Sequence, residues 1–475
     1  MAEPDRPPPS TTLRDSFLLL AVGLAALLPG LWQNHEWASG ESLHAEIGRE
    51  MAVRGDWIVP TRLGGPWVDE PPTVHVPIAA LIRWTGSRSM FVARLPSLAA
   101  GLAGVLATFS IGLLLFDRRV AWMGALVLLT FPAYANTARA VRPDLAVGAL
   151  VFLSSASVGW GMARRNPAAR LALFVAGGIT AGMATLAKGP TALAFPLAVV
   201  ALVPVGRPGF VRPRWFEVPV LVVALAAGIA TWTVPAWTRD GGVYVREVLG
   251  PAAPRVGTEG RPLHEQVERL LLGHLPLSIF LPLAIGRWSR HGFSAALAIC
   301  GAGLLLALAL PGKPFLLAAS PFLALAIAEA VLAPDLPFPW LATFARRLVP
   351  LTIFGSIVYF TAVLAFVRPE GDPDFVFAAK SMERVGPETA VVCVSRRGED
   401  FAWVAGRVEG IYEVYNCDDA ARLVTELGPG TCFVATVQDR DAIAERLGGR
   451  RLEILLEYEA GDRSWFLCRP HPMAE

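Results

Sequence analysis

The sequence predicts an α-helical polytopic membrane protein that ends in a small α/β domain, and three observations support this prediction. First, 54% of the 475 residues are hydrophobic and only 17% are charged, whereas a soluble domain carries roughly a quarter charged residues. Second, apolar runs long enough to cross a bilayer recur between residues 14 and 367. Third, residues 369–475 lose these runs and gain charge.

The apolar runs predict about eleven transmembrane helices. The first run lacks a small-residue cleavage site in front of a soluble domain, so we expect it to be a retained helix and not a signal peptide. The stretch 73–86 is apolar but short, which favours an interfacial or re-entrant helix. The runs lie near 14–33, 90–116, 120–136, 145–163, 169–187, 190–206, 217–237, 268–287, 292–310, 314–333 and 348–367.

Arginine orients these helices. If residues 1–13 are a cytoplasmic tail, every connection assigned to the cytoplasm holds or closely flanks at least two arginines, as the positive-inside rule requires. The long first loop, 34–89, and the tail then lie outside a bacterial inner or plasma membrane. The cytoplasmic segments would be 1–13, 117–119, 164–168, 207–216, 288–291 and 334–347.

Residues 369–475 predict one extracytoplasmic α/β domain, since about 100 residues suffice for a small domain. Four of the five cysteines lie in it and are interpreted as core or disulfide cysteines, with no CxxC spacing that would suggest zinc. They are Cys393, Cys417, Cys432 and Cys468. We expect strands at 390–395 and 432–436, helices at 418–427 and 439–447, and a closing strand pair in LEILLEYEAG and SWFLCRP.

Ionisable side chains gather in the loops assigned to the outside and not at mid-membrane. Charge is costly in lipid, so this concentration at one face predicts a site there. Arginine and lysine bind phosphate, and a carboxylate can act as base towards a hydroxyl or amine. The mixture suits an anionic, lipid-linked small molecule. The net charge of +2, without a basic cluster, argues against nucleic acid.

The segment ESLHAEIGREM, residues 41–51, has helical spacing that places Glu46 and Glu50 on one face. It predicts an amphipathic helix on the membrane surface, beside a site, with Glu41 at its N-terminal end. The alternative is a solvated helix face whose charges serve solubility.

Several motifs then follow one another in a definite order. GESLHAEIGREMAVRGDWIVPTRLGGPWVDEPP spans 40–72, and weaker matches are PAW (235–237) and PGKPFLLAASPFLALA (311–326). Over residues 14–333 this order resembles the GT-C type integral membrane glycosyltransferases, the group that includes protein O-mannosyltransferases and the lipid A aminoarabinose transferase. Between the long motif and the weaker ones stand RLPS (94–97), FDRR (116–119), TARAVRPDLAV (137–147) and LAKGPTALAFPL (186–197).

The resemblance implies a GT-C fold and an enzyme. The enzyme would transfer a sugar from a polyprenyl-phosphate donor to a lipid, glycan or protein acceptor at the outer face. No cofactor is established by the sequence, and a divalent metal held by an outer acid and a histidine stays an open alternative. Glu41 and Asp144 are the candidate catalytic residues, and Lys188, Arg255, Arg261 and Lys313 the candidates for donor phosphate. Other candidate site residues are Asp69, His44, Arg142 and His264.

The sequence departs from the family pattern at three positions. Gly40 stands where the family has aspartate, Glu70 where it often has lysine, and Phe315 near a family tyrosine. The resemblance implies that this lysine meets the donor phosphate, which a glutamate would repel. The aspartate's role then falls to Glu41, to Asp144 or to no residue. A catalytically degenerate relative that acts as a binding or assembly partner is therefore the alternative function. A transporter is disfavoured, because no inverted repeat is visible and the charges gather at one face.

Each candidate residue also has a structural interpretation. Asp144 could cap a helix, Glu41 could favour a helix N-terminus, and Lys188 could extend to the membrane interface. Arg255 and Arg261 could face anionic headgroups. His264 could be an ordinary structural histidine, and Asp69 could cap the apolar segment that follows it.

Overall fold

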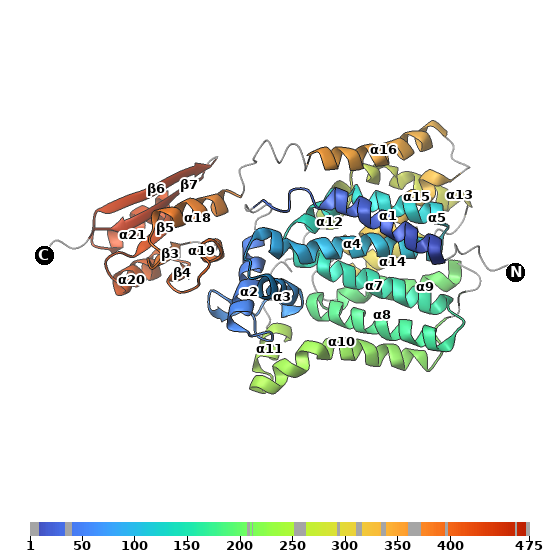
Figure 1. Cartoon of the computed structure of the whole chain (residues 1–475), viewed down its shortest axis with the longest axis horizontal. Helices are drawn as coiled ribbons and strands as arrows, with labels where there is room; N and C mark the ends of the chain where they lie inside the picture. The colour runs from blue at the N-terminus through green and yellow to red at the C-terminus, as the bar shows by residue number, and fades with distance from the viewer. Residues whose placement is uncertain are drawn as a thin grey trace. The chain divides into compact units, whose positions relative to one another are not determined.

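The structure is a computed structural model of the whole chain (Figure 1). It divides into two compact units, which we describe separately. The helical unit comprises Met1–Leu31, Val68–Val74 and Arg94–Val367, and the mixed unit comprises Trp32–Trp67, His75–Ala93 and Arg368–Glu475. The described residues are 9–33, 40–206, 210, 212–250, 263–291, 295–309, 316–333, 339–359, 372–394, 398–460 and 463–471.

Helices form where the apolar runs predict them, because a run that must cross lipid has to satisfy its backbone hydrogen bonds internally. The helices are α1 (Pro9–Leu27), α4 (Met90–Leu115), α5 (Arg118–Leu129), α6 (Pro132–Arg139), α7 (Pro143–Ala163), α8 (Pro167–Lys188), α9 (Ala194–Gly206), α10 (Glu217–Asp240), α11 (Val243–Leu249), α12 (Leu263–Gly273), α13 (Leu281–His291), α14 (Ala295–Ala309), α15 (Ser320–Leu332) and α16 (Pro339–Val358). Short 3-10 turns are η1 (Pro72–Val74), η2 (Pro190–Leu193), η3 (Leu277–Phe280) and η4 (Leu316–Ala319).

Among the described residues, four helices are long and apolar enough to cross a membrane, namely α4, α7, α8 and α10. The number rises to six if two bent helix pairs each count as one span. Arg118–Leu129 with Pro132–Arg139 bends by 65°, and Val267–Gly273 with Leu277–Gly286 bends by 109°. The α-helical, multi-pass character is thus confirmed, whereas the total of eleven spans stays a prediction. Helix α16 begins before the predicted run at 348–367.

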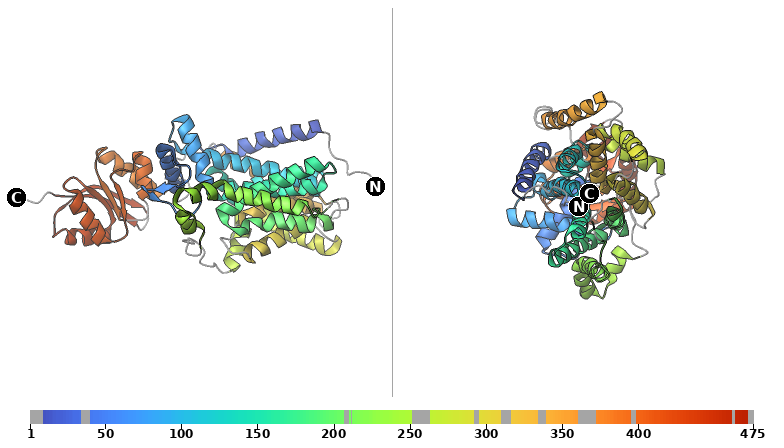
Figure 2. Two further views of the ribbon diagram at one scale, coloured as in Figure 1. Left: turned by 90° about the horizontal axis from the view of Figure 1, so that it is seen from below. Right: turned by 90° about the vertical axis from the view of Figure 1, so that its right-hand side faces the viewer.

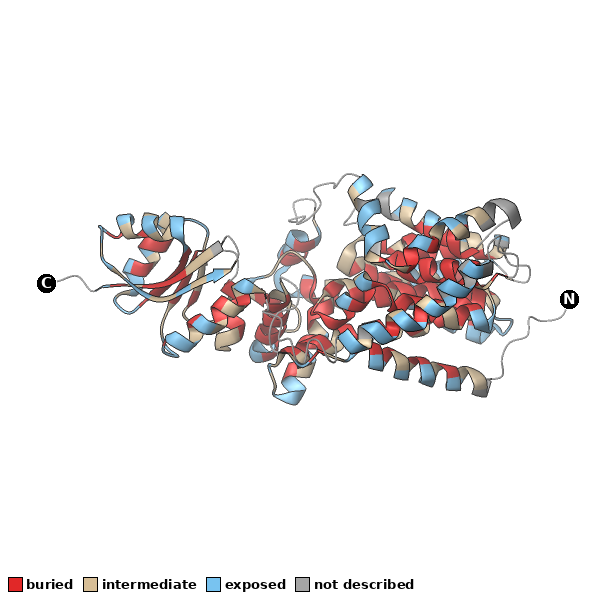
Figure 3. Ribbon diagram, turned by 90° about the horizontal axis from the view of Figure 1, so that it is seen from above, coloured by how far each residue is buried: buried red, intermediate tan, exposed pale blue. Residues whose placement is uncertain are grey.

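Helices α7, α8 and α10 lie side by side in that order (Figures 1 and 2). Small residues permit the contact between α8 and α10, because a Cβ atom at Gly182 would lie 2.1 Å from the carbonyl oxygen of Leu225. Ser154 of α7 donates a hydrogen bond to the carbonyl of Gly177 at 2.9 Å. Close backbone approach and interhelical hydrogen bonds of this kind drive helix association in lipid. Figure 3 shows the buried residues concentrated on the inward faces of this unit's helices.

The C-terminal part of the mixed unit contains a five-stranded sheet in the order β4-β3-β5-β7-β6. β3 (Val391–Val394) runs parallel to both β4 (Ile411–Val414) and β5 (Cys432–Thr436). β7 (Arg463–Pro470) pairs antiparallel with both β5 and β6 (Leu452–Ala460). The predicted strands β3 and β5 and the closing pair β6 and β7 are confirmed. β4 was not predicted.

Helices cover both faces of this sheet. Along β3, Val391 and Cys393 pack with the first helix pair and Val392 and Val394 with the second, as side-chain alternation in a strand buried on both faces requires. The first pair is α18 (Pro373–Arg384) and α19 (Gly398–Ala405), and neither was predicted. The second pair is α20 (Cys417–Leu427) and α21 (Val437–Arg446), as predicted.

The cysteines of this unit are packing residues. Cys393, Cys432 and Cys468 are buried in the two clusters that flank the sheet, and Cys417 is partly buried. All four are free thiols in the structure. Of the two interpretations made from sequence, the core one therefore describes them.

The first loop contributes α2 (Glu41–Arg54), a hairpin of β1 (Thr61–Arg62) and β2 (Gly65–Pro66), and α3 (His75–Thr85) to the mixed unit. Helix α2 packs against α3, β1 and α19. The helix is confirmed, but its charged face is neither solvated nor laid on a surface. Its acidic residues and one arginine are buried, namely Glu41, Glu46, Glu50 and Arg49.

Candidate active site

Three predicted or noted residues of the helical unit meet at one point. The Lys188 ammonium lies 2.9 Å from Oδ1 of Asp144 and 3.4 Å from Oε1 of Glu70. The side chains of Lys188 and Glu70 are 9% and 14% exposed, whereas that of Asp144 is 43% exposed. The site is thus a shielded ammonium between one shielded and one accessible carboxylate.

Lys188 is held in place by the way α8 ends. Gly189 has φ 73° and donates its N–H to the carbonyl of Thr185 at 2.7 Å, so the helix stops directly after the lysine. Pro190 cannot continue the helical bonding. The hydroxyl of Thr191, which is buried, donates to the carbonyl of Lys188 at 3.0 Å. The motif LAKGPT therefore terminates a helix and fixes the lysine at its end, where a cation is favoured by the helix dipole.

Asp144 lies in the first turn of α7, behind Pro143 at the first helical position. The N-cap position belongs to Arg142, so Asp144 is not the N-cap residue. The backbone N–H of Arg142 lies 3.4 Å from the hydroxyl of Ser97, which comes from the RLPS motif on α4. A carboxylate in the first turn is favoured by the helix dipole. Helices α7 and α8 are neighbours, so the start of α7 and the end of α8 bring the Asp144 carboxylate and the Lys188 ammonium together.

Glu70 is carried by the short segment Asp69-Glu70-Pro71-Pro72, which leads into η1. The η1 turn packs against both α7 and α8, so Glu70 is delivered to the junction of the same two helices. Two carboxylates facing one ammonium leave the trio with a net charge of −1. Sequence reasoning treated Glu70 as a group that would repel phosphate and missed its pairing with Lys188. No local signal shows this pairing, because 118 positions separate the two residues.

The structure places two other candidates, Glu41 and His44, in the mixed unit. Glu41 begins α2 and is fully buried. It follows Gly40, whose φ of 91° lies in the left-handed region, which a residue with a Cβ enters only at a cost. The glycine thus has a conformational reason to occupy the position of the family aspartate. Nδ1 of His44 lies 3.1 Å from Nε2 of His75, and the two rings stack.

The remaining charges of the first loop have structural partners within the mixed unit. Arg49 donates to both carboxylate oxygens of Glu46 at 2.6 and 2.7 Å, and burial raises the pKa of Glu46 to about 7 against the opposing effect of this guanidinium. The carboxylate of Glu50 accepts from the hydroxyl of Thr61 and the backbone N–H of Leu63, each at 2.6 Å. These groups shape the loop and its hairpin.

The first loop is also bonded to the C-terminal sheet domain. Ser42 donates a hydrogen bond to Asp400, and Arg49 donates to the carbonyl of Gly406 at 3.2 Å. Nη2 of Arg62 lies 2.7 Å from both Glu399 and Glu413. Sequence reasoning missed this network, because its partners are 337 or more positions apart.

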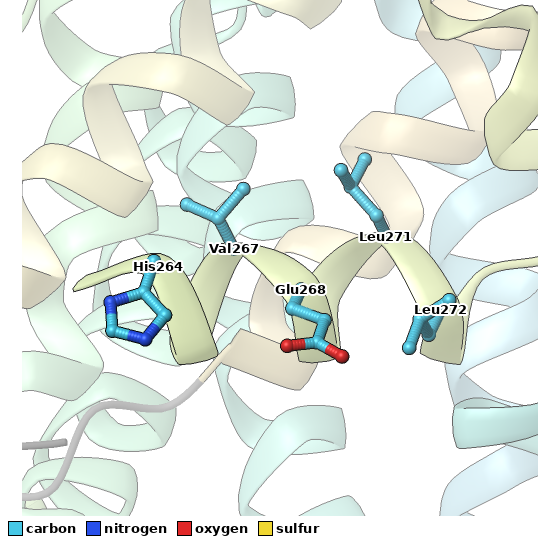
Figure 4. Close-up of a pocket in the computed structure, with 5 residues that line it drawn as sticks. All are labelled: His264, Val267, Glu268, Leu271 and Leu272. Atoms are coloured by element: carbon cyan, nitrogen blue, oxygen red, sulfur yellow. The ribbon is translucent and has the colours of Figure 1, made fainter. Parts of the chain in front are cut away.

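Arg255, Arg261 and Lys313 lie outside the described residues, and Phe315 does also. Asp69 is partly exposed next to Glu70. His264 lies on α12, where with Val267, Glu268, Leu271 and Leu272 it lines an open groove of about 550 Å³. Figure 4 shows Val267 and Leu271 projecting from one side of this helix.

Within the described ranges, no three histidine, cysteine or acidic side chains group as metal ligands would.

Comparison with known proteins gives one family match and a set of relatives. Residues 69–233 match the family described as dolichyl-phosphate-mannose-protein mannosyltransferase. An undecaprenyl phosphate-alpha-4-amino-4-deoxy-L-arabinose arabinosyl transferase of Pectobacterium carotovorum is 28% identical over 48% of this chain and 41% of its own length. The chain spans between 35% and 54% of the length of the first curated relatives it matches.

Solved structures extend the likeness across the chain. The crystal structure of ArnT from Cupriavidus metallidurans bound to undecaprenyl phosphate aligns with TM-score 0.72 at 17% identity, covering 96% of this chain and 98% of that one. The oligosaccharyltransferase AglB of Archaeoglobus fulgidus aligns with TM-score 0.53 at 13% identity, over 90% of this chain and 70% of that one. At these identities the likeness shows the fold alone. The protein is an integral membrane protein that resembles the GT-C type glycosyltransferases in motif order, in sequence and in fold.

Proposed function

We propose that the protein transfers a sugar from a polyprenyl-phosphate donor to an acceptor hydroxyl or amine. The observation that carries the proposal is the shielded Lys188 ammonium beside the accessible Asp144 carboxylate. The fold is that of an enzyme crystallised with undecaprenyl phosphate, and curated relatives are named as transferases that use such a lipid.

In this mechanism Lys188 binds the phosphate of the donor. A charge-assisted hydrogen bond from a shielded ammonium contributes about 1.5–3 kcal/mol, and it becomes stronger as negative charge develops on the leaving phosphate. Asp144 takes the proton of the acceptor. The acceptor atom forms a bond to the anomeric carbon while the bond from that carbon to the phosphate oxygen breaks, and its electron pair leaves with the polyprenyl phosphate.

We place this reaction at the extracytoplasmic face of the inner or plasma membrane, with the C-terminal domain on the same side. The arginine distribution supports that orientation. Arg255, Arg261 and Lys313 are proposed as further phosphate ligands, and Glu41 as a second catalytic carboxylate. The sugar and the acceptor are not specified by any residue we describe.

The test is sugar transfer in membranes from a panel of labelled polyprenyl-phosphate sugars. We expect transfer by the wild type, a fall of about 10- to 150-fold in Lys188→Ala from the energy above, and loss of turnover in Asp144→Asn. Asp15→Asn is a matched control. It removes a carboxylate on α1 that pairs with Arg118 of α5 and does not belong to the trio. Wild-type silence together with unchanged lipid binding in Lys188→Ala would contradict the proposal and favour the degenerate-relative alternative.

A further inference from the structure

The two carboxylates that share Lys188 are not equivalent. Asp144 is the nearer, at 2.9 Å, and its side chain is 43% exposed. Glu70 lies at 3.4 Å and is only 14% exposed. Glu70 is further confined by Pro71 and Pro72 and by the packing of η1 against α7 and α8. Asp144 is therefore the carboxylate with more access to water, and Glu70 is the one with less.

A donor phosphate that reaches Lys188 would be the third anion around one ammonium. Like charges this close repel one another strongly where water is partly excluded, so the donor phosphate and the two carboxylates compete for the ammonium. The carboxylate that can be solvated is the one that gives way. That carboxylate is Asp144.

We propose that Lys188 exchanges partners when the donor binds, an inference that rests on the proposed function. The donor phosphate replaces Asp144 on the ammonium, while Glu70 keeps the ammonium in the site. A carboxylate engaged by an ammonium is a weaker proton acceptor than a released one. Donor binding therefore activates Asp144, and the acceptor is deprotonated only when a donor is present.

The chemical step then balances within the site. The proton of the acceptor O–H or N–H passes to the released Asp144 carboxylate, and the acceptor atom bonds to the anomeric carbon. The bond from that carbon to the phosphate oxygen breaks, and its electron pair stays on the polyprenyl phosphate, paired with Lys188. Glu70 is a positioning residue in this scheme and touches no reacting atom.

The exchange predicts that removing the catalytic carboxylate of Asp144 strengthens binding of the lipid phosphate. Undecaprenyl phosphate, which carries no sugar, is titrated into purified full-length protein in lipid nanodiscs, and affinity is expressed per folded molecule. We expect Asp144→Asn to bind about two- to fivefold more tightly than wild type, because the competing ion pair is gone. Asp15→Asn, the matched control, should bind as wild type does. Asp144→Ser serves if the asparagine variant does not fold.

The outcomes separate the two proposals. Weaker binding in Lys188→Ala with tighter binding in Asp144→Asn supports both. Weaker binding in Lys188→Ala with equal or weaker binding in Asp144→Asn overturns the exchange and leaves the phosphate site standing. Unchanged binding in Lys188→Ala overturns the phosphate site, and the exchange with it.

Glu70 is tested by kinetics on the sugar donor. Glu70→Gln keeps the shape but removes the charge, so Lys188 can hold both Asp144 and the donor phosphate, and less base is released. We expect kcat to fall about tenfold while the donor KM does not rise, with partial recovery in Glu70→Asp. A residue that only maintains the fold would lower the yield of folded protein without this split. Unchanged kcat, or a tenfold rise in KM, would overturn the positioning role.

Discussion

Arg62 ties the first loop to the C-terminal sheet domain, and its removal should loosen the mixed unit strongly. One guanidinium nitrogen lies 2.7 Å from the carboxylates of both Glu399 and Glu413, whose side chains are only 5% exposed. Burial raises the pKa of Glu399 in spite of the nearby guanidinium. In Arg62→Met two shielded carboxylates would face each other without a cation.

The expected cost follows from this geometry. Removing one partner of a buried ion pair costs about 3–5 kcal/mol, because the other charge stays buried. That energy corresponds to a rise between about 100-fold and several thousand-fold in the population of the opened unit. Limited trypsin digestion of the full chain reports this population at Arg49, which is buried within α2 and becomes cleavable only when the unit opens.

A compensating variant sharpens the assay. Arg62→Met with Glu399→Gln and Glu413→Gln removes both unpaired charges, so it should recover most of the lost protection. The Arg118→Met control breaks an ion pair with Asp15 in the helical unit and should leave digestion of the mixed unit unchanged. Protection in Arg62→Met equal to wild type, or a triple variant as labile as the single one, would refute the reasoning.

Three further predictions concern single positions. Burial raises the pKa of Glu46 from 4.5 to about 7, so the folded unit holds a proton that the unfolded chain releases. Protonated Glu46 contributes fully to the free energy of unfolding below pH 4.5. This contribution, up to about 3 kcal/mol, is lost as pH rises through 7. Protection measured across this window should fall in wild type and stay flat in Glu46→Gln. Gly40→Ala should destabilise the start of α2 by about 1–2 kcal/mol, because the site requires φ 91°, and Gly40→Asn by less. Digestion at the described arginines of α2 would measure both. Thr191→Val should lower donor binding modestly, by about 0.5–1.5 kcal/mol, through the lost hydrogen bond to the Lys188 carbonyl. Lipid titration would show it.

The helices could be predicted from sequence because the bilayer fixes both their length and their composition. The same holds for β3, where four consecutive buried residues show as an apolar run. β4 could not be predicted, since Ile411–Val414 contains Tyr412 and Glu413 and is mostly half-buried beside a single strand. A local hydrophobic pattern predicts a strand only where all of its residues share the same degree of burial.

Individual residues of the candidate site could be predicted from sequence, but their arrangement in space could not. Asp144 and Lys188 were identified through their motifs, and the structure pairs them. Glu70 was expected to oppose phosphate, and its contact with Lys188 depends on where η1 packs. The sequence allowed the charges of α2 to be solvated, because no segment near α2 in the sequence buries them. Helix α19, which packs against α2, begins only at Gly398.

The bond between Ser42 and Asp400 also has a consequence for biosynthesis. The ribosome must add 358 residues after the serine before its partner exists, which takes about 20 to 70 s at 5–20 residues per second. Throughout that interval α2 has no C-terminal domain to pack against. Because burying charge in lipid is costly, we expect the charged side chains of α2 to keep the nascent loop in water during this interval.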